Sequence, residues 1–430
     1  MQFLLVLLIS PPLHAAENPI SISLDAVVKP FSKHALSYPK HTVDTFTRGI
    51  EYLTDNAVGE ENKTGQNQYP SFPTYRTKLS IKSNYNISGQ GNTTGRMNEE
   101  QKSVTALVDI SSPFVWMQGT APLSLATDYA INSSCRPSDY SKGSGASYVA
   151  DLVFPPSVSN IKFVYDEAKG INDGSDDILA VFGLSNNPCS LLRQLGYSNF
   201  SYCFAPNSSQ SSAVLLGSDF TLRKSWDHQP AQLVQNNNFP SAYSVNLSGV
   251  SVGNTEVPVD ALSFQENGPV NMILDSVTPV TLLKREAYES VKQEFLYQMS
   301  QMKVANVPSS SLGLDLCFSN PTFWPQLALK FFPAATMTLS RENYVVKDHD
   351  TGLECLAILP SQDVSVMGTM MQVNHLMIFD VDKSTLSFEQ ADCGELSVSS
   401  ATDVSVPRGV QIIHYISLVA IFFAAILAMG

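Results

Sequence analysis

The chain has 430 residues, of which 43% are hydrophobic and only 15% are charged, and its formal net charge is −13. This length fits a two-lobed protein with a large core, because one domain takes roughly 100–200 residues. The excess of 39 acidic over 26 basic residues argues against a nucleic-acid binder, which normally carries a basic surface.

The N-terminal residues 1–16 combine a short apolar run with Pro11, Pro12 and the pair Ala15-Ala16. This arrangement predicts a signal peptide, and a buried N-terminal strand is the alternative. Residues 17–68 are polar and poor in strand patterns. They predict a leader segment outside the β core, with a disordered extension as the alternative.

From Tyr75 onward, short apolar runs alternate with clusters of Gly, Pro, Asn and Ser, which predicts many short β-strands. The clearest expected strands are 79–82, 106–108, 161–164, 213–216, 243–247, 272–274, 335–339 and 376–379. One helix is expected over about 284–304. Its apolar side chains at helical spacing predict core packing: Tyr288, Val291, Phe295, Met299 and Met302.

Two segments repeat one pattern, in which an apolar strand runs into an aspartate, a turn of small or hydroxyl residues and a second apolar strand. The aspartates are Asp109 and Asp275. Each half later has an apolar stretch that ends in glycine, at Gly183 and Gly368. The repeat predicts two duplicated β lobes that each contribute one carboxylate.

A lone aspartate at a strand end is usually a turn or cap residue, whereas two at equivalent positions suggest joint chemistry. Facing carboxylates cannot both ionise easily, so one pKa falls and the other rises. The ionised partner can then take a proton from water while the neutral partner polarises a peptide carbonyl. Asp109 and Asp275 are therefore the candidate catalytic pair.

These turns and several flanking segments resemble the pepsin-like aspartic peptidases, in particular their nepenthesin-like plant branch, over about residues 70–395. The segment 138–146 is similar to the family's flap, and 184–203, 246–253, 341–344 and 380–393 are similar to other lobe segments. The resemblance implies a mostly β, bilobal pepsin-like fold with few short helices. Its lobes would span 69–222 and 223–395, and residues 17–68 would be a prosegment.

The resemblance also implies a peptide or protein substrate in the cleft between the lobes, and no cofactor. Tyr140 would close the flap over this substrate and Trp116 would pack behind it, while Ser276 and Thr278 would line the substrate site. Because no CxxC occurs and the His residues are scattered, we expect no metal site.

The family's turn reads Asp-Thr/Ser-Gly, whereas this chain has Asp109-Ile110-Ser111 and Asp275-Ser276-Val277. Ser276 retains the hydroxyl that braces the partner turn, but Ile110 lacks it. Ser111 and Val277 replace a glycine that allows close backbone approach. The chain is thus expected to be an aspartic endopeptidase active at acidic pH. The alternative is a catalytically impaired or inactive pepsin-like protein of binding or inhibitor type.

Six cysteines allow fifteen disulfide pairings. By resemblance to the family, Cys317 would pair with Cys355 and Cys203 with Cys393, while Cys135 and Cys189 would pair with each other or stay free. Seven sequons predict N-glycosylation on the secretory route: Asn62, Asn86, Asn92, Asn132, Asn199, Asn207 and Asn246.

The C-terminal residues 396–430 contain small residues, a polar spacer and an apolar stretch, a pattern typical of a GPI attachment signal. A retained transmembrane helix is the alternative. We therefore expect a monomeric glycoprotein outside the cell, held at the plasma membrane through this segment.

Overall fold

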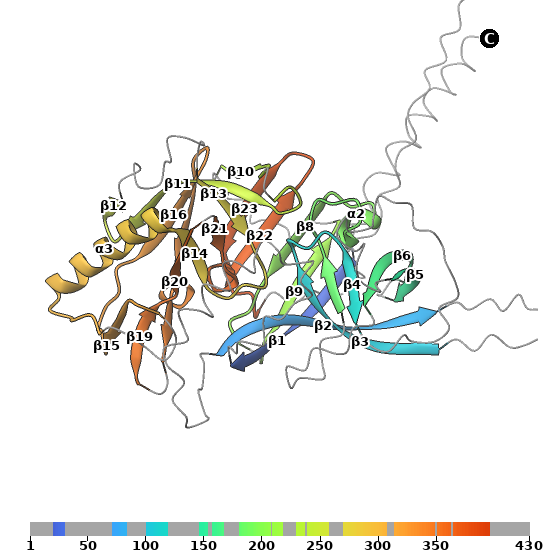
Figure 1. Cartoon of the computed structure of the whole chain (residues 1–430), viewed down its shortest axis with the longest axis horizontal. Coiled ribbons are helices and arrows are strands. Elements are labelled where there is room, and N and C mark those ends of the chain that lie inside the picture. Colours follow the sequence, from blue (N-terminus) through green and yellow to red (C-terminus); the bar gives the residue numbers. More distant parts are fainter. Residues whose placement is uncertain are drawn as a thin grey trace, which may run out of the picture. The chain divides into compact units, whose positions relative to one another are not determined.

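The computed structural model describes residues 20–30, 71–83, 100–118, 146–153, 157–166, 180–207, 209–217, 229–236, 239–257, 270–307, 314–348, 351–362 and 364–395. All of these residues belong to one compact unit. Strands outnumber helices throughout this part of the chain (Figure 1). The expectation of a mostly β protein with few short helices is confirmed.

The first lobe is built from short strands and one helical turn. Its elements are β1 (Ile20–Pro30), β2 (Ser71–Ser83), β3 (Glu100–Asp109), β4 (Val115–Gln118), β5 (Ala146–Val153), β6 (Ser157–Asp166), β7 (Ala180–Gly183), α2 (Leu191–Gln194), β8 (Asn199–Cys203) and β9 (Ser211–Leu216).

The second lobe contains the longest helix. Its elements are β10 (Ala231–Val234), β11 (Ser244–Val252), β12 (Thr255–Val257), β13 (Val270–Leu274), β14 (Thr281–Lys284), α3 (Arg285–Gln301), β15 (Cys317–Ser319), β16 (Leu327–Phe331), β17 (Ala335–Leu339), η4 (Arg341–Asn343), β18 (Val345–Lys347), β19 (Leu353–Leu356), β20 (Ile358–Ser361), β21 (Ser365–Met367), α4 (Thr369–Gln372), β22 (His375–Asp380) and β23 (Thr385–Gln390).

The strand pairing repeats between the lobes. In the first lobe, β7 lies parallel to β3 and antiparallel to β4, and β4 lies parallel to β6. In the second lobe, β21 lies parallel to β13 and antiparallel to β14, and β14 lies parallel to β20. In each lobe, the aspartate therefore lies at the end of a strand that is paired with an inserted strand. A glycine lies at the end of that inserted strand. The predicted duplication is confirmed at the level of topology.

One antiparallel sheet links the two lobes, in the strand order β1-β9-β8-β22-β23-β10. Aromatic side chains pack across it: the rings of Phe200 and Phe379 stack with centroids 4.5 Å apart, and Tyr243 lies 5.1 Å from Phe379. Such pairs add about 0.5–1.5 kcal/mol each beyond the area they bury. The sheet therefore holds the aspartate turns in register through a common core.

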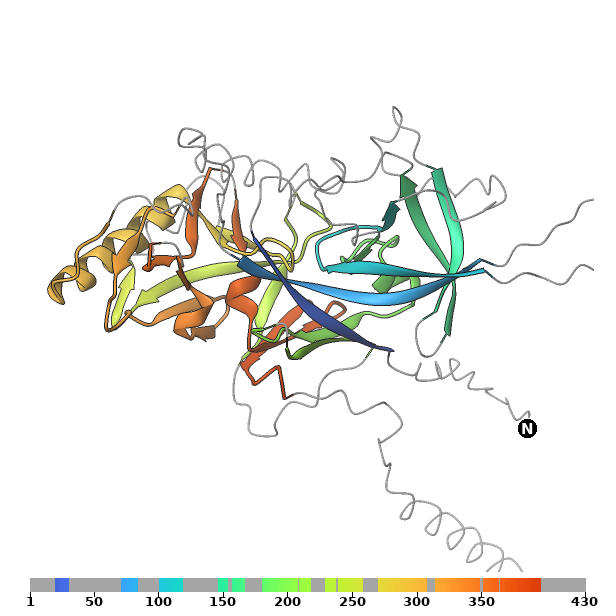
Figure 2. The same ribbon diagram turned by 90° about the horizontal axis from the view of Figure 1, so that it is seen from below.

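The predicted leader contributes a strand to this sheet. Strand β1 lies within residues 17–68 and pairs with both β2 and β9 (dark and light blue strands in Figure 2 for β1 and β2). Its alternate side chains Ile20, Ile22 and Leu24 are buried in the main core, whereas Ser23 is exposed. The expectation that this whole segment stands outside the β core is wrong, because its residues 20–24 alternate apolar and polar side chains as a half-buried strand does. Its role as a prosegment stays a prediction.

Helix α3 confirms the helix expected in the second half. The side chains of Tyr288, Val291, Phe295 and Met299 are buried along one face. Met302 lies just past the last helical residue and is 37% exposed, so its expected place in the core is wrong.

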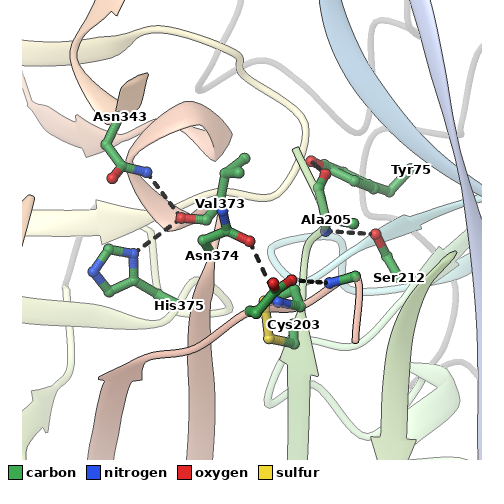
Figure 3. Close-up of a disulfide and its surroundings, with 11 residues drawn as sticks. Tyr75, Cys203, Ala205, Ser212, Asn343, Val373, Asn374 and His375 are labelled. Atoms are coloured by element: carbon green, nitrogen blue, oxygen red, sulfur yellow. Dashed lines mark hydrogen bonds between the residues drawn. A yellow bond between two sulfur atoms is a disulfide. The ribbon is translucent and has the colours of Figure 1, made fainter. Parts of the chain in front are cut away.

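Two disulfides confirm the pairings that the resemblance implied. Cys317 bonds Cys355 between β15 and β19, and Cys203 bonds Cys393 beside the linking sheet. Figure 3 shows the second disulfide with Tyr75, whose hydroxyl donates to the carbonyl of Ala205 at 2.8 Å. Cys189 is also disulfide-bonded, and Cys135 lies outside the described residues.

Within the ranges given above, no helix combines the length and the apolar character that crossing a bilayer requires. The signal peptide over 1–16 and the anchor segment over 396–430 fall outside the described residues.

Candidate active site

Asp109 is the last residue of β3, and its backbone carbonyl accepts a hydrogen bond from Leu184 N at 2.9 Å. Its side chain is only 8% exposed. Three donors converge on Oδ1: Ser111 N at 2.8 Å, Ser111 Oγ at 2.7 Å and Ser112 N at 3.2 Å. Burial raises the pKa of the Asp109 carboxyl, and these hydrogen bonds oppose that rise.

Asp275 directly follows β13 and is 2% exposed. Val277 N donates to its Oδ1 and Thr278 N to its Oδ2, both at 3.0 Å. Burial and then the negative charge of Asp109 raise the pKa of Asp275 to about 7, while hydrogen bonds from Thr278 and Val277 oppose this rise. The two carboxyls therefore sense each other directly, as an acid–base pair that shares one proton must.

Ser276 joins the two turns. Its hydroxyl accepts a hydrogen bond from Ile110 N at 3.1 Å and donates to the carbonyl of Val108 at 3.0 Å. Ile110 is fully buried and apolar, so its side chain cannot return such a bond. The brace between the turns thus comes from the second lobe alone.

The substituted third positions of both turns keep their backbone donors. Ser111 and Val277 are half-buried, and each directs its backbone N–H to the carboxylate two residues earlier. Val277 therefore does not push its turn away from Asp275. The two turns differ in their side chains, because Ser111 supplies a hydroxyl to the carboxylate and Val277 supplies none.

The chain is similar to a known domain in its second lobe and to plant aspartic proteinases over about half to two thirds of its length. A family model described as the xylanase inhibitor C-terminal domain matches residues 242–390. Aspartic proteinase nepenthesin-1 of Nepenthes gracilis is 36% identical over 248 residues, which are 55% of this chain and 55% of that protein. Nepenthesin-2 of the same plant is 28% identical and matches 63% of this chain and 64% of its own length.

By these similarities the chain resembles the pepsin-like aspartic proteases, in particular their nepenthesin-like plant branch. It spans between half and two thirds of the length of these curated relatives. Solved structures agree on the fold: basic 7S globulin from soybean has a TM-score of 0.58 at 14% identity, covering 88% of this chain and 99% of that chain. The structure titled edgp has a TM-score of 0.58 at 15% identity, with 88% and 96% covered.

In each lobe, a glycine lets the inserted strand approach the aspartate turn closely. A side chain at Gly183 would meet the carbonyl oxygens of Ser112 and Phe114 at 2.3 Å, and one at Gly368 would meet that of Val280 at 2.3 Å. Contacts this short exclude any Cβ atom. The apolar stretches that end in glycine therefore correctly indicated the two aspartate turns.

Gln372 and Tyr202 support the second turn, and the sequence analysis missed both. Gln372 Nε2 donates to the backbone carbonyls of Asp275 at 2.7 Å and Met367 at 3.1 Å, while its Oε1 accepts a hydrogen bond from the Tyr202 hydroxyl. Burial, and then the charge of Asp275, raises the pKa of Tyr202. A polar residue between the apolar Met371 and Val373, four residues after Gly368, was the available signal.

Of the remaining predicted site residues, the structure places Thr278 at the carboxyl pair. Thr278 lies in the second turn and is buried. Trp116 lies in β4, with its side chain outside the described atoms, and Tyr140 lies outside the described residues. No cluster of three or more potential metal ligands occurs in the described ranges.

A cavity of about 600 Å³ lies away from the aspartate turns. It is lined by β17 and β23 residues together with His375, and no residue of either turn contributes to its wall. It is therefore distinct from the site of the carboxylate pair.

Proposed function

We propose that this chain is an aspartic endopeptidase whose reacting groups are Asp109 and Asp275. The observation that carries the proposal is the placement of two buried carboxyls on duplicated turns that the Ser276 hydroxyl joins. The charge of Asp109 helps to raise the pKa of Asp275 to about 7. Asp275 then holds a proton below about pH 7. The hydrogen bonds that Asp109 accepts from Ser111 and Ser112 favour its ionised form, which general acid–base catalysis requires of one partner.

In the proposed reaction a water molecule lies between the two carboxyls and the scissile peptide. Asp109 takes a proton from this water as its oxygen bonds to the carbonyl carbon, and Asp275 gives its proton to the carbonyl oxygen. When the tetrahedral intermediate collapses, the C–N bond breaks and the amine leaves with the proton that Asp109 took. The carbonyl re-forms as the oxygen's proton returns to Asp275, which regenerates the starting pair.

The substrate is proposed to be an extended peptide or unfolded protein segment between the lobes, with Tyr140, Trp116, Ser276 and Thr278 in contact with it. Nepenthesin-1 and nepenthesin-2, the relatives with which this chain shares 36% and 28% identity, are named aspartic proteinases. This agreement supports a peptide-bond substrate. The assay is cleavage of an acid-unfolded protein between pH 2 and 7, with Asp275→Asn and Asp109→Asn as matched inactive variants.

A second function is favoured by one specific observation. The model that matches 242–390 is described as a xylanase inhibitor C-terminal domain, and Ile110 removes half of the usual brace between the turns. An inhibitor-type protein would bind a xylan-degrading enzyme and cleave nothing. Inhibition of a xylanase that persists in Asp275→Asn, together with the absence of proteolysis, would establish this second function in place of the first.

The proposed location is the cell surface, reached through the secretory pathway with N-glycans and a GPI anchor at the C-terminal segment. The disulfides fit an oxidising compartment. Three sequon asparagines lie in the described ranges. Asn207 is exposed and its Oδ1 accepts from Ser209 Oγ at 2.5 Å, whereas Asn199 is half-buried in β8 and Asn246 lies between paired strands. Release from membranes by phosphatidylinositol-specific phospholipase C tests the anchor, and loss of one glycan in Asn207→Gln tests glycosylation.

A further inference from the structure

The two turns each give their carboxylate one side-chain hydroxyl, but from different positions. Asp275 receives its hydroxyl from Thr278, three residues later. At the equivalent position after Asp109 stands Ser112, whose hydroxyl donates instead to the carbonyl of Phe114 at 3.3 Å. The hydroxyl that reaches Asp109 comes from Ser111, at 2.7 Å.

Ser111 occupies the position that glycine holds in the family's turn, so its side chain is an addition to the motif. The addition fits without displacing the turn, because Ser111 N still donates to Oδ1 at 2.8 Å and Ser112 N does so at 3.2 Å. All three donors meet Oδ1, and none of the three goes to Oδ2. Hydrogen bonds to an ionised carboxylate are stronger than those to a neutral acid, so this arrangement favours the charged form.

We propose that Ser111 is a positioning residue for Asp109: its hydroxyl holds Oδ1 and favours the ionised carboxylate, which leaves Oδ2 to receive the proton of the attacking water. This inference rests on the proposed peptidase function. The Ser111 hydroxyl, which the family motif lacks, thus replaces the Ser112 hydroxyl, which bonds to Phe114 and not to Asp109. The proton taken from water goes to Oδ2, the water oxygen bonds to the carbonyl carbon, and Asp275 protonates the carbonyl oxygen.

In the described part of the chain, Asp275 interacts with this carboxylate by charge, and Tyr202 interacts with Asp275. Asp275 lies across the site, and the charge of Asp109 contributes to its raised pKa. The Tyr202 hydroxyl donates to Gln372, whose amide donates to the backbone carbonyl of Asp275. Burial, and then the charge of Asp275, raises the pKa of this phenol. A change at Ser111 should therefore move the lower of the two pKa values that the carboxyl pair shows, and Asp275 should follow through its coupling to Asp109.

The test is an NMR titration of the full chain with ¹³C-labelled aspartate carboxyls, in which Asp109→Asn and Asp275→Asn identify the signals. Ser111→Ala and Ser111→Gly should raise the lower pKa of the pair by about one pH unit. Ser111→Thr, which keeps a hydroxyl, should titrate as the unsubstituted chain does. Ser112→Ala is the matched control, because its lost hydroxyl contacts Phe114, and it should leave this pKa in place.

A Ser111→Ala titration that matches the Ser112→Ala control, in chains with native circular dichroism, would overturn the inference. So would a Ser111→Thr chain that shifts as much as Ser111→Ala. The titration needs no turnover: a shift without any proteolysis would reject the peptidase function and keep the role of Ser111 in the carboxyl pair. Proteolysis whose acid limb stays in place in Ser111→Ala would keep the function and reject the role of Ser111.

Discussion

The hydroxyl of Ser276 accepts a hydrogen bond from the backbone N–H of Ile110 at 3.1 Å, across 166 positions of sequence. The same hydroxyl donates to the carbonyl of Val108 at 3.0 Å. In a symmetric pair of turns, the residue at position 110 would carry a hydroxyl that makes the same bonds to the second turn. Ile110 has a buried apolar side chain instead. The side-chain hydrogen bonds between these two turns therefore come from one residue of the second lobe.

Ser276→Ala removes both bonds and leaves two buried backbone groups without their partner. We expect the free energy of unfolding to fall by about 1–3 kcal/mol, and kcat/KM to fall about 100-fold as the carboxyls lose their alignment. Urea unfolding and a peptide-cleavage assay measure the two effects. Unchanged kcat/KM in a folded Ser276→Ala chain would show that the brace is dispensable.

Ile110→Thr is the complementary variant, because it offers the second turn the hydroxyl that Ile110 lacks. We expect kcat to rise severalfold while stability changes by about 1 kcal/mol or less, since the new hydrogen bond offsets the smaller buried apolar surface. A fall in kcat would show that the missing hydroxyl does not limit the reaction.

Asp275 should make the protein more stable in acid than at neutral pH. Its pKa in the folded chain is about 7, raised from 3.8, so folding favours the protonated form. This contribution is fully present below about pH 4 and is lost as the pH rises toward 7. Thermal unfolding from pH 4 to 8 should therefore show a declining melting temperature, and the decline should be smaller in Asp275→Asn. An equal decline in both chains would contradict the assigned pKa.

We expect Gln372 to contribute more to the free energy of unfolding than its partner Tyr202 does. Gln372→Leu leaves the carbonyls of Asp275 and Met367 without a side-chain donor, and we expect it to lower the free energy of unfolding by about 2–3 kcal/mol. Tyr202→Phe removes only the bond to Gln372 Oε1 and should lower it by about 1 kcal/mol. Chemical denaturation of both variants measures the difference. Equal effects would mean that Gln372 does not hold the second turn.

The alternating side chains of β1 allow a test of whether this strand belongs to the stable core. Leu24 is fully buried in the core, while its neighbour Ser23 is exposed. Leu24→Ala should therefore lower the free energy of unfolding by about 2–5 kcal/mol, and Ser23→Ala should change it by less than about 0.5 kcal/mol. If the two variants unfold alike in urea, then β1 does not belong to the stable core.

Much of this arrangement follows from patterns in the sequence. The repeated strand–aspartate turn and the later apolar stretch that ends in glycine predict the paired turns, because inserting a strand there requires a residue without Cβ. The helical spacing of Tyr288, Val291 and Phe295 predicts the buried face of α3, since each contributes to a continuous apolar stripe.

Other features depend on tertiary contacts that local patterns do not encode. The Ser111 hydroxyl reaches Asp109 only because the Ser112 hydroxyl turns to Phe114, and two adjacent serines look equivalent in sequence. Gln372 acts on Asp275 from 97 positions away. The local alternation in β1 is that of a strand, but it does not specify the pairing with β2 and β9, which are distant in sequence.

The most direct measurement is the rate at which the chain, purified from a secretory host, cleaves an acid-unfolded protein at about pH 4, beside its Asp275→Asn variant. The account predicts peptide-bond cleavage by the unsubstituted chain and a loss of at least about 1,000-fold in Asp275→Asn, because one carboxyl cannot be both acid and base. No cleavage by the folded chain at any pH from 2 to 7, or equal cleavage by both chains, would contradict it.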